Sequence, residues 1–178
     1  MTAVRALSLV VLALFSAALL GCGEKSDEKK AATRPAALFK EPPSGLTYKA
    51  PDAATEKRVK DLLTKSGDLS GDDVAVRQVL QKGGLGQPIA VGVAVDTHLS
   101  GDPGDALKGF TDGAKDQTGE EPQSEVIAGT KTTLAKLSGT VVTAGEKNGY
   151  LVEAIAPDTD TAQKVLKRLI VAAGEATR

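Results

Sequence analysis

The clearest strand pattern in this chain covers residues 88–96, where bulky and small apolar residues alternate. The bulky positions are Ile89, Val91, Val93 and Val95, and the small ones are Ala90, Gly92 and Ala94. Successive side chains of a strand point to opposite faces, so one face of this strand is bulky and the other nearly bare. A bare face lets another element approach closely, most often a packed helix.

The clearest helix pattern lies near the C-terminus, after the start signal Pro157-Asp158-Thr159. Its apolar residues follow helical spacing on one face: Ala162, Val165, Leu166, Leu169, Ile170 and Ala173. A second helix is predicted from Ala53 to Lys65, after Asp52 as N-cap. A third is predicted to begin at Asp102-Pro103, because an N-cap residue followed by proline is a strong helix start.

Shorter apolar runs predict the remaining strands, with a reversal at 145–149 that makes the last two a hairpin. These runs are 45–50, 74–81, 124–129, 133–142 and 150–156. Hairpins outnumber parallel crossovers in the resulting order. We therefore predict an α+β fold: a mostly antiparallel sheet of about five to six strands packed by about three helices.

The first 21 residues have the character of a secretion signal. Arg5 precedes an apolar run from Leu7 to Leu20, which is too short for a bilayer span of about 20 residues. The segment Leu19-Leu20-Gly21-Cys22 then resembles the lipobox of bacterial lipoproteins. That resemblance implies transfer of diacylglycerol to the Cys22 thiol, cleavage before Cys22, and often acylation (for example by palmitate) of the new amine. Leu20 is larger than the usual residue at its position.

This reading divides the chain into three parts. Residues 1–21 are the lipoprotein signal peptide, and residues 22–44 are the lipidated Cys22 and a disordered tether. The tether is rich in charge and proline and poor in large apolar residues, so it has little surface to bury. Residues 45–178 form a single α+β domain. The expected location is the extracytoplasmic face of the cell membrane, where membrane lipid holds the protein through acylated Cys22.

The second half of the chain also shows a pattern of elements over residues 103–174. A central helix precedes the strand Val126–Lys131, the segment Leu134–Gly139, the strand Gly149–Glu153 and a final helix rich in Ala, Val and Leu. This order is similar to the Mog1/PsbP-like domains of secreted bacterial lipoproteins. The resemblance implies an antiparallel sheet between helices and an accessory or binding role, and it assigns no functional residue here.

Composition and motifs argue against several classes of function. The net charge is −1, which gives no electrostatic footprint for nucleic acid. Cys22 is the only cysteine, so no internal disulfide forms. The segment Ala128–Thr132 lacks the glycines of a phosphate loop, so we predict no nucleotide site.

His98 is the only histidine and lies near Asp96 and Asp102. Such a loop offers an imidazole and carboxylates to a divalent cation, but its spacing matches no EF-hand and is better explained as a strand-end loop. No serine elbow supports His98 as the base of a hydrolase. We therefore predict no catalytic residue, no cofactor and no metal, and leave the question of cation binding at this loop open. Glu153 is expected to face solvent or a groove.

The sequence thus favours a membrane-anchored extracytoplasmic lipoprotein that acts as a non-catalytic binding or accessory module of the cell envelope. Its partner is then another envelope protein, and an unpaired sheet edge or an exposed apolar patch would support this role. The alternative is a small-ligand or lipid carrier with an apolar pocket between the sheet and a helix, over Ala90, Gly92 and Ala94. That alternative fails if Leu107, Phe110 or the final helix fills the space.

Overall fold

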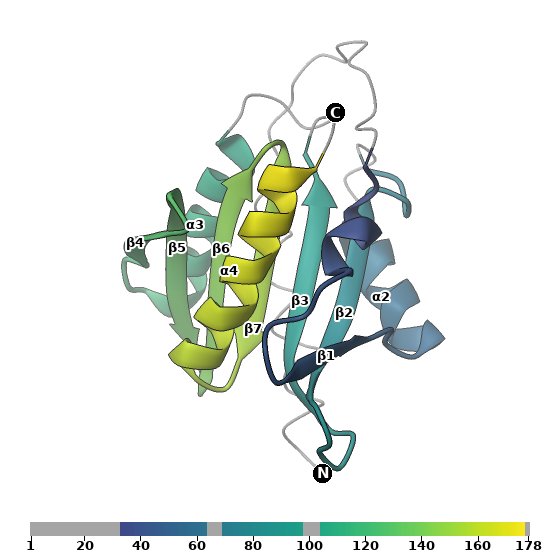
Figure 1. Ribbon diagram of the computed structural model, residues 1–178. Helices are drawn as coiled ribbons and strands as arrows, with labels where there is room; N and C mark the ends of the chain where they lie inside the picture. The colour runs from purple at the N-terminus through teal and green to yellow at the C-terminus, as the bar shows by residue number, and fades with distance from the viewer. Residues whose placement is uncertain (1–32, 64–68, 98–103, 177–178) are drawn as a thin grey trace.

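The computed structural model describes residues 33–63, 69–97 and 104–176 (Figure 1). A 3-10 helix, η1 (Pro35–Phe39), precedes the other elements. The strands are β1 (Leu46–Lys49), β2 (Val74–Gln81), β3 (Pro88–Asp96), β4 (Gln123–Ile127), β5 (Thr130–Leu137), β6 (Thr140–Lys147) and β7 (Tyr150–Ala156). The helices are α2 (Ala53–Leu63), α3 (Asp105–Thr118) and α4 (Thr159–Glu175).

The described strands form one open, fully antiparallel sheet in the order β1-β2-β3-β7-β6-β5-β4. Two meanders meet at its centre, where β3 pairs with β7 and Gly92 lies opposite Ala154. The α+β prediction is confirmed. The predicted number of strands is too low, because the sheet has seven strands rather than five to six.

Three two-residue turns join the strands of the second half of the sheet, and one of them explains the difference in strand number. Ala128-Gly129, Ser138-Gly139 and Asn148-Gly149 each have positive φ at both residues, which is typical of type I′ hairpin turns. The turn at Ser138-Gly139 divides the run predicted as a single strand over 133–142 into β5 and β6. The reversal predicted over 145–149 is confined to Asn148-Gly149, and β6 continues to Lys147. The three glycines recur every ten residues, a regular spacing that marks a meander.

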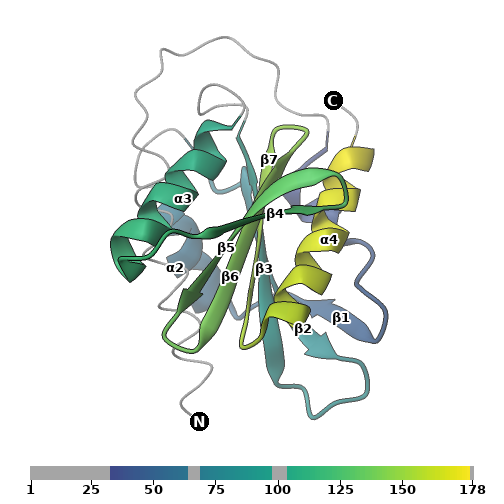
Figure 2. The same ribbon diagram turned by 90° about the vertical axis from the view of Figure 1, so that its left-hand side faces the viewer.

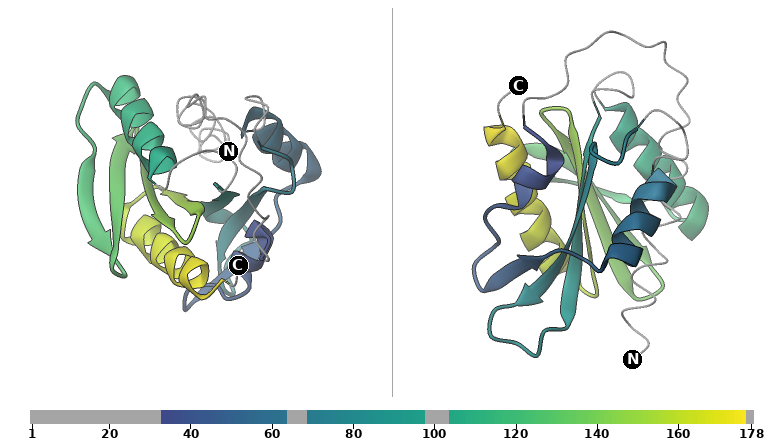
Figure 3. Two further views of the ribbon diagram at one scale, coloured as in Figure 1. Left: turned by 90° about the horizontal axis from the view of Figure 1, so that it is seen from above. Right: turned by 90° about the vertical axis from the view of Figure 1, so that its right-hand side faces the viewer.

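Helices cover both faces of the sheet (Figures 2 and 3). On one face α4 packs over β7, β6 and β3, and η1 packs beside it over β2 and β3. On the other face α3 lies over β5 and β6, and α2 lies over β2. Each face has its own apolar cluster, so the sheet is buried on both sides.

Two of the three helices begin at an aspartate whose side chain caps the first turn, as predicted. Asp158 Oδ1 accepts a hydrogen bond from the Thr161 N–H at 2.8 Å, and Asp52 Oδ1 accepts one from the Thr55 N–H at 2.9 Å. The prediction that Asp102 caps the third helix is wrong. Gly104 is the N-cap of α3, and Asp102 itself lies outside the described residues.

The predicted disordered tether is wrong for residues 33–44, because this stretch packs against the domain. Leu38 and Phe39 of η1 are buried in the cluster under α4. The Phe39 ring meets the Tyr48 ring edge to face, with 5.1 Å between the ring centroids. At the ends of the stretch, the Tyr150 hydroxyl donates to the Thr33 carbonyl and Arg168 pairs with Glu41. The packed domain therefore includes these residues rather than starting at residue 45.

Replacing Phe39 with Ala should destabilise the whole domain by about 3 kcal/mol, because it removes a buried ring and leaves a cavity. Urea denaturation followed by circular dichroism measures this change. Lys40→Ala is the control, since Lys40 is exposed and adjacent. Equal stabilities of the Phe39→Ala variant and the control would mean that η1 does not belong to the folded unit.

Candidate functional site

Of the site residues expected from the sequence, Asp96 lies within the described part of the chain. Cys22, His98 and Asp102 lie outside the described residues. Asp96 is described and buried at the end of β3, where its backbone N–H donates to the Asp73 carbonyl at 2.8 Å. Within residues 33–63, 69–97 and 104–176, no three His, Cys, Asp or Glu side chains gather in a way that would hold a metal. None of the helices in these ranges is long and apolar enough to span a membrane.

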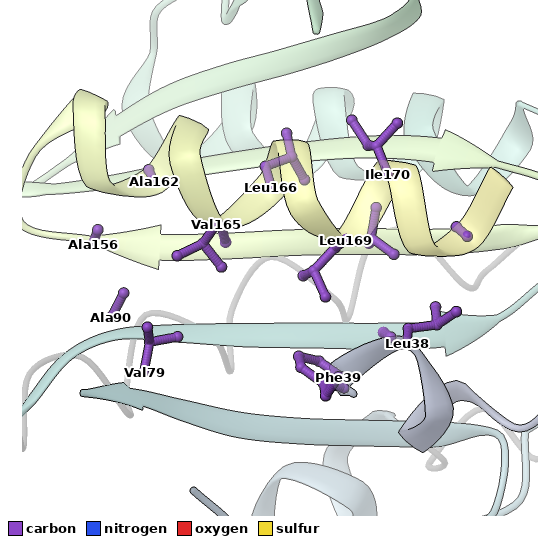
Figure 4. Close-up of a cluster of buried hydrophobic side chains, with 14 of the residues drawn as sticks. Leu38, Phe39, Val79, Ala90, Ala156, Ala162, Val165, Leu166, Leu169 and Ile170 are labelled. Atoms are coloured by element: carbon purple, nitrogen blue, oxygen red, sulfur yellow. The ribbon is translucent and has the colours of Figure 1, made fainter. Parts of the chain in front are cut away.

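The small-residue face of β3 is filled by other parts of the chain (Figure 4). A Cβ placed on Gly92 would lie 2.8 Å from Phe39 Cε1 and 3.4 Å from Leu169 Cδ1. Ala90 and Ala94 are fully buried in the same cluster. The small-residue face of β3 is therefore closely approached by other elements, as predicted, and these elements are η1 and α4. The apolar pocket that a carrier would need at this place is occupied by these side chains.

The outer side of β4 is an unpaired sheet edge, and Figure 2 looks onto it. The Ala128-Gly129 turn closes on the pair Ile127 and Thr130. A two-residue type I′ turn closes on a hydrogen-bonded pair, and such pairs alternate along an antiparallel ladder. The backbone groups of Ser124 and Val126 therefore face away from β5. The Val126 side chain is 73% exposed, which is unusual for a large apolar residue at mid-strand.

An open groove runs between this edge and α4, with a volume of about 510 Å³. Residues of β4 and its turn line one side, and one stripe of α4 lines the other. The lining residues are Glu125, Val126, Ile127, Ala128, Asp160, Gln163, Lys164 and Lys167. The four helix residues follow the spacing i, i+3, i+4 and i+7, so they share the face of α4 that turns toward the edge.

The groove holds charged groups that are only partly satisfied. Gln163 Nε2 donates to Glu125 Oε2 at 2.7 Å, but Glu125 Oε1 is buried and receives no hydrogen bond. The hydroxyl of Thr130, which pairs with Ile127 on β4, is likewise buried without a partner. Lys164 and Lys167 are exposed and form no ion pair with any described residue. The edge thus combines an acceptor that lacks a donor with two cations that lack an anion.

A second anomaly lies at the centre of the sheet. Glu153 is 1% exposed on β7, directly between Val93 of β3 and Ala144 of β6, and these neighbours belong to the cluster on the α2/α3 face. The expectation that Glu153 faces solvent or a groove is therefore wrong. No hydrogen bond reaches Glu153 Oε1, and burial raises the pKa of this carboxyl well above its usual value.

The sequence reasoning missed both the edge and its charged groups. The signal was present in the final helix, where Asp160, Gln163, Lys164 and Lys167 form a polar stripe beside the apolar one. Which strand this stripe faces depends on strand order, which the sequence alone does not show.

Comparison with models of protein families, with curated proteins and with solved structures finds no match to this chain.

Replacing Glu153 with Gln should stabilise the domain increasingly as the pH rises. The folded state keeps the Glu153 proton above pH 4.5, the usual pKa of glutamate, while the unfolded state releases it. Unfolding of the wild type therefore becomes easier with rising pH, by up to about 1.4 kcal/mol per unit, until the folded-state pKa is passed.

Urea denaturation of both proteins from pH 4.5 to 8.5 measures the difference. Glu153→Met, which removes the buried acid without adding an amide, should show the same pH trend relative to the wild type. If the difference in unfolding free energy between the variants and the wild type does not change with pH, Glu153 is not a buried, protonated acid.

Proposed function

We propose that this protein is a lipid-anchored lipoprotein on the extracytoplasmic face of the cell membrane, where it acts as a non-catalytic binding or accessory module of the envelope. The anchor in this proposal is Cys22, at the end of the lipobox-like segment Leu19–Cys22. Acyl chains on that residue contribute about 0.8 kcal/mol for each buried methylene, which suffices for stable attachment when two or more chains are present.

The observation that carries the binding role is the unpaired β4 edge. Exposed backbone donors and acceptors at a sheet edge are a ready template for pairing with another chain. Natural proteins usually protect such edges, yet here Val126 is exposed at the middle of the strand beside a groove with unsatisfied charge. This combination suits a surface that receives another polypeptide.

The carrier alternative has less support. It requires empty apolar space between the sheet and a helix, and the space over Ala90, Gly92 and Ala94 contains Phe39 and Leu169. The groove beside β4 is open and lined mainly by polar and charged side chains, whereas pockets for small apolar ligands are enclosed and mostly apolar.

Replacing Cys22 with Ser should abolish the incorporation of a labelled fatty acid into the protein in cells that express the full chain. A serine hydroxyl is no substrate for lipidation of a thiol, so no acyl chain is attached at this position. Leu20→Ala is the matched control, because it also alters the lipobox-like segment but introduces a small residue of the usual kind.

The control should incorporate the label as the wild type does, and its Cys22 should carry acyl chains by mass spectrometry. An unmodified Cys22 thiol in the wild-type protein would end the proposal of a lipid anchor.

A further inference from the structure

We propose that the β4 edge pairs with β4 of a second copy of this chain, in an antiparallel arrangement centred on Val126. The inference rests on the proposed binding role of this edge and names its partner. Three features of the described residues support it: the direction of the backbone groups, the placement of charge, and the exposed apolar side chain at the centre of the strand.

The backbone suits a two-fold arrangement. The outward N–H and C=O groups belong to Ser124 and Val126. In an antiparallel pair centred on Val126, the two copies of this residue lie opposite each other and exchange both of their hydrogen bonds. Such an interface uses the same patch on both subunits, as closed dimers require. The resulting sheet runs without a break through both copies.

The charges of the groove are self-complementary. Glu125, Ile127 and Gln123 share the face of β4 that α4 covers, as the Glu125–Gln163 hydrogen bond shows. A strand added beside β4, about 4.8 Å away, occupies the groove below Lys164 and Lys167. When that strand is a second β4, it brings its own Glu125 to these lysines.

Each copy in this way supplies the opposite charge that the other lacks. The Glu125 carboxylate of one copy lies close to the exposed ammonium groups of Lys164 and Lys167 of the other, and the reverse holds by symmetry. The groove has two acidic and two basic side chains, so a strongly acidic or strongly basic partner would meet like charge in it. A second copy matches this balance.

The apolar contact lies on the opposite face. The Val126 side chain alternates with Glu125 and Ile127 and so points away from α4. In the proposed register the two Val126 side chains lie side by side across the two-fold axis and shield each other from water. This contact accounts for an exposed valine at the centre of an edge strand.

Disulfide trapping in native membranes tests the proposal with the full chain. Val126→Cys should form a disulfide-linked dimer after mild oxidation, seen on non-reducing electrophoresis. Leu85→Cys is the matched control, because Leu85 is the other large exposed hydrophobic residue among the described ones and lies on the loop between β2 and β3. We expect roughly tenfold more dimer from Val126→Cys, since pairing places its thiols at high effective concentration.

The wild type reports separately on Cys22. A dimer of the wild type would mean that the Cys22 thiol is free, which contradicts the lipid anchor but not the edge pairing. Equal dimer yields from the two cysteine variants would reveal random collisions and overturn the edge pairing. A Val126→Cys product linked to a different protein would overturn the second copy as partner while leaving the edge as a binding surface.

Charge exchange tests the proposed contacts in the Val126→Cys background. Glu125→Lys, and separately Lys164→Glu with Lys167→Glu, should each reduce the dimer yield by about threefold or more, because each places like charges together. Combining all three substitutions should restore it. Yields that stay at the parent level in every variant, or that do not recover in the combination, would overturn the proposed register.

Discussion

The pairing of β3 with β7 is the contact on which the rest of this structure depends. It joins a three-strand meander from the first half of the chain to a four-strand meander from the second half. At this junction Gly92 lies opposite Ala154. Because both residues are small, Phe39 and Leu169 can pack directly on the sheet. β3 and β7 are the last strands of their meanders. Because these two strands pair with each other, the first strands, β1 and β4, become the edges of the sheet.

Acidic side chains at the centre of the sheet and at its β4 edge lie in different surroundings. Glu153 lies at the centre, where its strand neighbours are Val93 and Ala144 and no donor reaches Oε1. Its carboxyl stays protonated over a wider pH range than usual and costs stability rather than adding it. Glu125 lies at the β4 edge, where Gln163 donates a hydrogen bond to one oxygen and the other is buried without a donor. The edge therefore combines outward backbone groups, which another chain can reach, with unmet hydrogen bonding.

Local patterns predicted the local elements well. The alternation over 88–96 gave the bounds of β3, and the spacing of apolar residues after Asp158 gave the buried face of α4. The prediction failed where long-range contacts decide. Residues 33–44 look too polar to fold by themselves, but Leu38 and Phe39 find a place over β3 that only the assembled sheet provides. Ser138-Gly139 is a turn dipeptide, but the apolar residues on both sides of it also fit one continuous strand, so the local pattern does not decide between one strand and two.

The candidate site was harder to predict than the fold for the same reason. Asp160, Gln163, Lys164 and Lys167 look like an ordinary solvated helix face until the strand order places β4 beside them. Glu153 likewise looks half-exposed until both of its neighbouring strands are known. The lipobox-like segment, in contrast, is a purely local signal, so the anchor is proposed from sequence alone.

Hydrogen exchange at two backbone amides tests the central claim, a self-pairing sheet edge, most directly. The outward N–H groups of Ser124 and Val126 have no partner among the described residues of one copy of the chain. The account predicts that both amides exchange slowly when the full-length protein is dense in lipid vesicles, and quickly once it is diluted into excess lipid. Rapid exchange of both amides at every density would contradict it.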